Sequence, residues 1–132
     1  MKNITDVIQW IFASIGGCLG YFFGGFDGFL YALLVFVVID YITGIMVAIL
    51  EKKLSSEVGF RGIFKKVLIF SFVAIGQIVD TQLIGQGSVL RTAVIFFYIS
   101  NEGISILENA TIIGLPVPEK LKDVLVQLKN NE

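Results

Sequence analysis

Long stretches without charge are the feature that most constrains this chain. A helix that crosses the hydrocarbon core of a bilayer needs about 20 predominantly apolar residues. Four stretches approach or reach this length: residues 7–26, 28–50, 67–84 and 89–107. The charged residues within them are Asp40, Asp80, Arg91 and Glu102. Too little of the chain remains for a separate soluble core, so the sequence predicts an all-α integral membrane protein with residues 1–132 as one membrane domain and a fourth helix that reaches about residue 110.

The composition excludes several classes of function. Hydrophobic residues make up 55% of the 132 residues and charged residues 16%, against about 45–50% and about 25% in soluble domains. Because the chain has no histidine and one cysteine, it offers no Cys/His zinc site, no Ser-His-Asp triad and no disulfide within one chain. The net charge of -1 provides no basic surface for nucleic acid. We therefore expect no enzyme activity, no metal or other cofactor and no nucleic-acid partner.

The distribution of Lys and Arg predicts the orientation, because loops beside membrane helices retain positive charge on the cytoplasmic side. Residues 51–66 and 116–132 hold most of the basic residues. We predict a cytoplasmic basic loop at 51–66 and a cytoplasmic tail at 116–132. The turns at 24–28 and 85–88 contain neither Lys nor Arg and are expected to face outward. If all four segments cross the membrane, both termini are cytoplasmic.

The first segment is rich in glycine, which lowers helix stability by about 1 kcal/mol per residue relative to alanine. Gly16, Gly20 and Gly24 recur at every fourth residue, a spacing that lets two membrane helices pack closely. The partner is either another helix of the same chain or a second copy, and Gly44 provides a similar small position in the second segment. Other interpretations of the first segment are a helix that re-enters or lies at the interface, which leaves three spans, and a cleaved signal peptide.

The tail begins at Pro116 and Pro118, which end the preceding helix and suit the first turn of a new one. Apolar residues then recur at helical spacing, opposite charged ones: Val117, Leu121, Val124, Leu125 and Leu128. We predict a short C-terminal amphipathic helix, which either lies on the membrane surface or pairs with its copies in an oligomer.

Polar residues within the second and fourth segments are the candidate functional residues. A charged side chain at mid-bilayer costs about 2.5–3.5 kcal/mol, so Asp40, with Thr43 on the same face, either makes a helix-packing contact or lines an aqueous path. Along the fourth segment, helical spacing places a set of polar side chains within one arc: Tyr98, Asn101, Glu102, Ser105, Glu108 and Asn109. The other helices of the chain offer few complementary groups for this arc. We therefore expect it to line a pore or to contact neighbouring copies.

Two pairings follow from depth in the membrane. Asp80 precedes the second outward turn by a few residues and Arg91 follows it by a few, so a hairpin brings them level. We predict that these two side chains form an ion pair. Asp40 and Glu102 also lie at similar distances from the outward turns, which places two carboxylates at one depth.

Several motifs resemble those of the phage lysis and toxin-secretion holins of Gram-positive bacteria and their phages. In the second segment and the residues after it they are DYITG at 40–44, KKLSS at 52–56 and GFRGIFKK at 59–66. In the fourth segment and the tail they are YISNEGISILEN at 98–109, PVP at 116–118 and LKD at 121–123. The resemblance covers about residues 28–129, and the block at 98–109 is its most specific part.

The resemblance implies a protein that accumulates in the bacterial cytoplasmic membrane, forms homo-oligomers in the lipid bilayer and opens a non-specific lesion. An endolysin or a large toxin then leaves the cytoplasm through the lesion, as a functional partner, and an antiholin is a further partner of such proteins. The resemblance also assigns Asp40 and Thr43 to a polar motif of the second helix. It assigns four residues to a motif of the fourth helix: Asn101, Glu102, Glu108 and Asn109.

Two other functions fit a chain of this kind. A small four-helix transporter, such as a proton-coupled drug exporter, has a similar length. Such exporters place their essential carboxylate in the first helix, where this chain has none between Asp6 and Asp27. A holin antagonist would share the fold and lack lytic action. We expect a holin, with the antagonist and the transporter as alternatives.

Overall fold

The computed structural model describes residues 3–130, and every regular element in this part of the chain is helical. The elements are α1 (Ile4–Phe23), α2 (Gly28–Leu50), α3 (Ser56–Ile78), its π-helical continuation η1 (Val79–Ile84), α4 (Val89–Ile113) and α5 (Glu119–Asn130). With α3 and η1 taken as one helix, α1 to α4 are long and apolar enough to cross a membrane. The predicted all-α membrane fold, with four candidate spans and a short C-terminal helix, is confirmed.

Polar residues define where the first three helices begin. Asn3 and Asp6 form a capping box at the start of α1, in which Asp6 N lies 2.9 Å from Asn3 Oδ1. The Asp27 carboxylate accepts a hydrogen bond from Leu30 N at 2.9 Å at the start of α2. Ser55 Oγ accepts one from a backbone amide of the first turn of α3 at 3.2 Å. Each bond satisfies an amide that has no partner within its own helix, so local sequence sets these boundaries.

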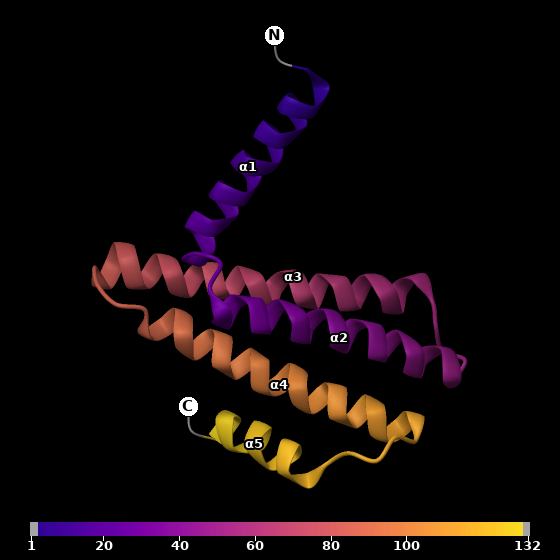
Figure 1. The fold of residues 1–132 in the computed structure, drawn as a ribbon. Helices are drawn as coiled ribbons and strands as arrows, with labels where there is room; N and C mark the ends of the chain where they lie inside the picture. Colours follow the sequence, from indigo (N-terminus) through magenta and orange to yellow (C-terminus); the bar gives the residue numbers. More distant parts are fainter. Residues whose placement is uncertain (1–2, 131–132) are drawn as a thin grey trace.

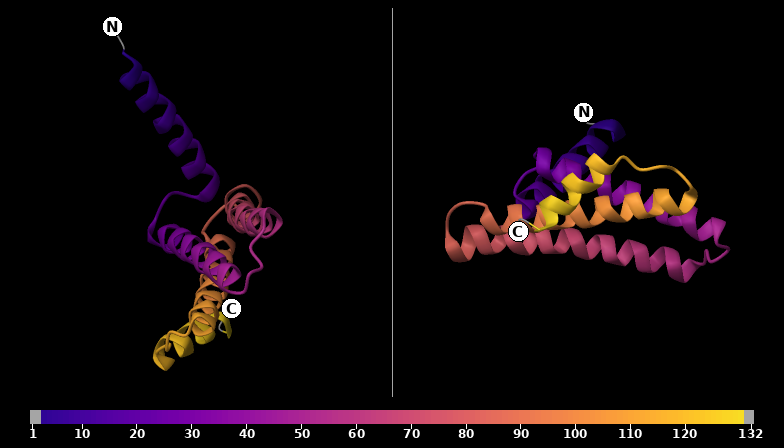
Figure 2. Two further views of the ribbon diagram at one scale, coloured as in Figure 1. Left: turned by 90° about the vertical axis from the view of Figure 1, so that its right-hand side faces the viewer. Right: turned by 90° about the horizontal axis from the view of Figure 1, so that it is seen from below.

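Helices α2, α3 and α4 lie side by side and form the bundle (Figure 1; Figure 2). α1 and α5 lie on opposite sides of this bundle. α1 stands away from it, and none of residues 4–23 is buried against the rest of the described chain. α5 follows the turn after α4 and runs back along that helix. The fold is therefore a three-helix core with one helix on each flank.

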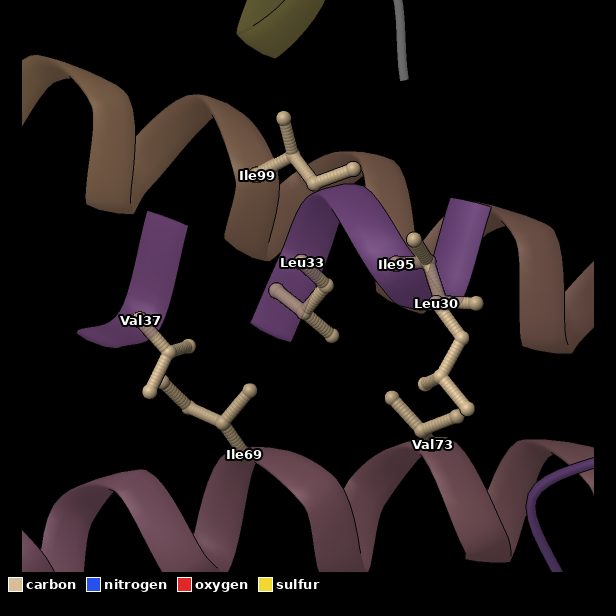
Figure 3. Close-up of a cluster of buried hydrophobic side chains, with 7 residues drawn as sticks. All are labelled: Leu30, Leu33, Val37, Ile69, Val73, Ile95 and Ile99. Carbon is tan, nitrogen blue, oxygen red and sulfur yellow. The ribbon is translucent and has the colours of Figure 1, made fainter. Parts of the chain in front are cut away.

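An apolar core holds the three packed helices together (Figure 3). Its buried members recur at helical spacing on the facing sides of α2, α3 and α4: Leu30, Leu33, Val37, Ile69, Val73, Ile95 and Ile99. The core occupies the half of the bundle nearer the α1–α2 turn, because its members on α2 and α4 precede Asp40 and Glu102, and its members on the antiparallel α3 follow Lys66. Charged side chains of Asp40, Lys66 and Glu102 lie directly beyond it.

Two close approaches fix the position of α3. The Tyr41 hydroxyl of α2 donates a hydrogen bond to the Gly59 carbonyl at 3.1 Å, and a Cβ on Gly62 would lie 3.1 Å from the same ring. Further along α3, a Cβ on Gly76 would lie 3.1 Å from the backbone nitrogen of Arg91. Glycine at these positions lets the helices approach more closely than any other residue would allow.

The structure corrects the predicted basic loop at residues 51–66. Helix α3 begins at Ser56, so the connection from α2 is residues 51–55, and Lys65 and Lys66 belong to the helix. The physical reason is that Lys, Arg and Glu are good helix formers, and Ser55 supplies an N-cap for them. A high density of charge does not by itself end a helix.

Candidate functional site

A cluster of charged side chains lies where α2, α3 and α4 meet. The Lys66 ammonium group donates hydrogen bonds to Asp40 Oδ2 and, at 2.6 Å, to Glu102 Oε1. Asp40 is 8% exposed and Glu102 is 6% exposed, so one cation serves two buried carboxylates. We call Asp40, Lys66 and Glu102 the triad.

The three groups of the triad lie at similar distances from one end of the bundle. At a rise of 1.5 Å per residue, Asp40 lies about 15 Å from the C-terminal end of α2, and Glu102 about 17 Å from that of α4. Lys66 lies about 15 Å from the start of α3, which is at the same end of the bundle. All three groups therefore lie at one level of the bundle, within the lengths of the candidate spans. Contacts among opposite charges there replace the water that the bilayer lacks.

Amide and hydroxyl groups extend the triad along the interior. Asn109 Nδ2 donates hydrogen bonds to Asp40 Oδ1 at 3.3 Å and to Thr43 Oγ1 at 2.9 Å. The Thr43 hydroxyl in turn donates to the Ile39 carbonyl at 2.9 Å, and Ser105 also faces Asp40. Among residues 3–130, every buried side-chain nitrogen and oxygen has a hydrogen-bond partner. The chain therefore satisfies its own interior polar groups.

The other residues of the predicted polar arc lie toward the edges of the bundle. Tyr98 is half-buried and packs on Phe72, with ring centroids 6.1 Å apart. Asn101 lines a cavity of about 490 Å³ at the side of the bundle, next to the triad. Glu108 is exposed and lines a cavity of about 610 Å³ between α4 and α5. The arc is therefore divided among the interior, the side of α4 that faces α3 and the side that faces α5.

Two residues of the arc need no neighbouring copy or water as a partner in this arrangement, whereas contact of the rest of the arc with copies or water stays a prediction. Glu102 and Asn109 find partners on α2 and α3 of the same chain. They do so because α3 starts early and carries Lys66 into the bundle. A role for Asp40, Thr43 and the arc in lining an open pore stays a prediction.

A second cluster lies at the other end of the bundle, around Arg91, which is 4% exposed. Its guanidinium donates to the Asp27 carboxylate at 2.8 and 3.2 Å, to the Gly25 carbonyl at 3.0 Å and to the Phe23 carbonyl. These bonds connect α4 to the turn between α1 and α2. The guanidinium also holds the pKa of Asp27 below its ordinary value, because it donates hydrogen bonds to the charged form.

The predicted Asp80–Arg91 ion pair is wrong in its partners. Asp80 is 1% exposed, and its carboxylate accepts hydrogen bonds from Leu90 N at 3.1 Å and Arg91 N at 2.9 Å. It therefore caps the start of α4 from η1. The hairpin brings the two residues level, as expected. The unpaired amides at the start of α4 hold the Asp80 carboxylate, and Asp27 reaches the guanidinium from the other turn.

The glycines predicted for helix packing fall into two groups. A Cβ on Gly16 or Gly20 would meet no atom of residues 3–130 within 4 Å, so close packing within the chain is wrong for these two, which line an apolar groove of about 400 Å³. Gly24 ends α1 with a φ of 82° and lies against the guanidinium described above. At Gly44 a Cβ would make an ordinary contact, 3.9 Å from Asn109 Nδ2. Self-association through Gly16 and Gly20 stays a prediction.

Sequence reasoning missed Lys66 and Asp27 as members of the two clusters. The position of Lys66 within a helix could have been inferred from Ser55, because Ser is a good N-cap and no proline follows it before residue 116. The signal for Asp27 was its position just before an apolar run, which is typical of an N-cap. Its contact with Arg91 depends on how the α1–α2 turn folds. Within residues 3–130, no group of three or more His, Cys, Asp and Glu side chains lies where it could hold a metal ion.

Comparison with known proteins identifies relatives over most of the chain. An uncharacterized 14.9 kDa protein of Clostridium perfringens, from the nagH 3' region, is 43% identical over 132 residues, the full length of both chains. An uncharacterized protein of Listeria monocytogenes is 41% identical over 120 residues, which are 91% of this chain and 85% of its own. The uncharacterized protein YqxH of Bacillus subtilis is 39% identical over 112 residues, 85% of this chain and 79% of its own. No solved structure matches the chain.

A sequence profile of the bacteriophage holin family matches residues 17–130. The matched region contains both charged clusters, the three packed helices and α5. The chain belongs to the bacteriophage holin family.

Proposed function

We propose that this protein is a holin that oligomerises in the bacterial cytoplasmic membrane and opens a non-specific lesion. An endolysin or a large toxin would leave the cytoplasm through this lesion. By the positive-inside rule, the connection at 51–55, the start of α3 and both termini lie on the cytoplasmic side. The function requires no catalytic group and no cofactor. Membership of the holin family supports the proposal.

The contrast between the interior of the bundle and its surface carries the proposal. Asp40, Lys66 and Glu102 neutralise one another inside, whereas large apolar side chains cover the outer faces of α2 and α3. A protein that only spans the bilayer has no need of charges inside its helix bundle, because each of them is costly to insert. Charges that are stored in a closed bundle can be turned to water when many copies assemble.

The charge balance of the triad favours that change. Two carboxylates share one ammonium group, so the closed bundle holds an excess negative charge when both carboxylates are ionised. Water stabilises such a charge far better than a bilayer interior does. Once assembly admits water beside α4, the triad therefore stabilises the open arrangement over the closed one.

Inducible expression in a bacterium tests the proposal. We expect growth to continue while the protein accumulates, and then an abrupt loss of membrane potential with release of a cytoplasmic enzyme. Resistance to particular drugs without enzyme release would indicate an exporter. Accumulation in the membrane without either effect, combined with a delay of lysis by a co-expressed holin, would indicate an antagonist.

A further inference from the structure

We propose that the seam between α3 and α4 binds one anionic phospholipid, with the lipid phosphate beside Lys65 and an acyl chain along the apolar part of the seam. Such a lipid site goes beyond the proposed function and requires no lesion. Three observations support it: two cavities that adjoin along the seam, the hydrogen-bond donors that line the first cavity and the apolar side chains that line the second.

The two cavities follow one another between α3 and α4, which lie side by side (Figure 2). The first has a volume of about 490 Å³ and lies next to the triad. The second has a volume of about 420 Å³ and lies further along the seam, toward η1. Phe72 and Tyr98 line both cavities, and their ring centroids are 6.1 Å apart. The cavities therefore form one elongated groove, which we call the seam groove.

Hydrogen-bond donors line the end of the seam groove next to the triad. These donors are Lys65, Lys66, Tyr98 and Asn101. Lys66 is bound to both carboxylates of the triad. The Lys65 ammonium group, the Tyr98 hydroxyl and the Asn101 amide have no hydrogen-bond or ion-pair partner among residues 3–130. These three groups are available to a ligand, and phosphate oxygens accept hydrogen bonds from groups of this kind.

The charges at this end favour an anionic lipid over a zwitterionic one. Glu102 also lines the cavity, but its carboxylate is bound to Lys66 at 2.6 Å. Lys65 is exposed and supplies a positive charge without a partner in the described chain. A zwitterionic headgroup already carries its own cation beside the phosphate, whereas an anionic headgroup carries none. Basic pockets between membrane helices bind anionic headgroups in the same way.

The position of Lys65 also suits the headgroup level of the membrane. A long basic side chain that is exposed on a membrane helix extends its charge to the interface, because hydrocarbon does not solvate it. Arg61, one turn before Lys65, is exposed as well. Residues 67–79, which follow on the same helix, contain no charged residue. The polar end of the seam groove therefore meets headgroups, and the rest of it extends toward hydrocarbon.

The second cavity suits an acyl chain. Every residue that lines it except Tyr98 is apolar, and Ile75 and Phe97 are among them. At 1.5 Å per residue, α3 and η1 rise about 21 Å from Lys65 to Val79. One leaflet contributes about half of a hydrocarbon core that is about 30 Å thick. The seam groove is thus long enough for an acyl chain whose headgroup lies at Lys65.

Quenching of fluorescence by brominated lipid tests whether the seam groove selects an anionic phospholipid. In a Trp10→Phe background, Phe97→Trp places a fluorophore in the apolar part of the groove. Val38→Trp is the matched control, because Val38 is exposed on α2 and lines neither cavity. The full chain is reconstituted into vesicles of phosphatidylcholine and phosphatidylglycerol, with bromine on the acyl chains of one lipid or the other. The quenching gives the relative affinity for the two lipids near each fluorophore.

We expect Phe97→Trp to report a preference for phosphatidylglycerol of about fivefold, the usual effect of one basic side chain on anionic lipid, and Val38→Trp to report none. Lys65→Gln should remove the preference, and Asn101→Ala should reduce it. Lys53→Gln removes an equal charge shortly before α3 and should leave the preference unchanged. All of these changes are at exposed or half-buried positions, so the variants should keep the fold.

Three results would overturn the proposed lipid site. Equal affinities of the two lipids at Phe97→Trp would show that ordinary bulk lipid covers the seam. A preference of the same size at Val38→Trp, or one that survives Lys65→Gln, would show a general attraction between charges. Protection of Phe97→Trp from both brominated lipids would show that a second copy covers the seam. Because the measurement involves no release of cargo, its failure and the failure of the proposed function are distinguishable.

Discussion

The ammonium nitrogen of Lys66 lies 2.6 Å from Glu102 Oε1, although the two residues are 36 positions apart and belong to different helices. The same ammonium group also binds Asp40. One side chain therefore joins α2, α3 and α4 at a single depth, beyond the end of the apolar core.

Lys66→Met should destabilise the closed bundle strongly. The change leaves two buried carboxylates without a cation, and breaking a buried ion pair from one side costs about 3–5 kcal/mol. The free energy of unfolding in detergent measures the effect. Lys65→Met is the matched control, because Lys65 is the exposed neighbour on the same helix, and its change should stay within about 0.5 kcal/mol. Equal effects of the two variants would show that the triad does not stabilise the bundle.

Neutralising all three residues of the triad should delay lysis without destabilising the folded bundle. Apolar or neutral side chains of similar volume often replace a buried ionic cluster without loss of stability, so a chain with Asp40→Asn, Lys66→Met and Glu102→Gln should insert and fold. Lysis should come later, since no stored charge favours water. The time from induction to loss of membrane potential, at matched membrane levels of protein, measures the delay. An unchanged time would remove the triad from the opening step.

Arg91→Gln should loosen the joint between α1 and the bundle. Gln cannot replace the paired bonds to Asp27 or the bonds to the Gly25 and Phe23 carbonyls, and a lost bond to a charged group costs about 1.5–3 kcal/mol. Spin labels at Cys18 and at Phe72→Cys would report a broader distance distribution. Arg61→Gln is the control, because Arg61 pairs with Glu57 at an exposed site, and a similar broadening there would contradict the assignment.

The Asp27–Arg91 contact also predicts a pH dependence with a defined sign. The pKa of Asp27 is lowered below its ordinary value of 3.8 in the folded protein, so the pair contributes full stability above 3.8 and loses it as the pH falls through the lowered pKa. Asp27→Asn keeps a good N-cap and removes the charge. The difference in stability between the parent and Asp27→Asn should be constant near neutral pH and shrink below 3.8. A difference that grows on acidification would have the wrong sign.

Glycines that look equivalent in sequence should respond differently to alanine. At Gly76 a Cβ would lie 3.1 Å from the Arg91 backbone, so Gly76→Ala should destabilise the bundle by about 1–3 kcal/mol through overpacking. At Gly20 the space is open among the described residues, so Gly20→Ala should be neutral or stabilise helix α1 by about 0.5–1 kcal/mol. Thermal unfolding of both variants in one detergent makes the comparison. A larger loss at Gly20 would place that glycine in an interface between copies.

The sequence was sufficient for the helices themselves, because apolar length and capping residues are local properties. It also brought Asp80 level with Arg91, and Asp40 level with Glu102, since depth along a helix can be counted. The sequence did not show which side chains bind each other. Which carboxylate reaches Arg91 depends on how two turns fold against each other, and neither turn can be placed from spacing alone.

Lys66 is a second residue whose contacts could not be predicted from the sequence. The high density of charge in residues 51–66 predicted that Lys66 belongs to a loop. Helix α3 instead begins directly after its N-cap Ser55, and Lys66 lies in the interior of the bundle. The contact between Leu125 and Gly103 was also outside the reach of pattern analysis. An amphipathic tail helix can lie on lipid or on protein, and a glycine-sized recess decides between them.

Release of folded proteins from vesicles is the decisive test of whether this protein opens a non-specific lesion. Vesicles are loaded with fluorescent proteins of graded size, and the purified chain is added at increasing protein-to-lipid ratios while its oligomeric state is followed by cross-linking. We predict sealed vesicles at low protein density and, above a threshold density, the joint appearance of oligomers and of released protein, including cargo as large as a cell-wall hydrolase. A chain that stays monomeric and leaves the vesicles sealed to proteins at every density would contradict it.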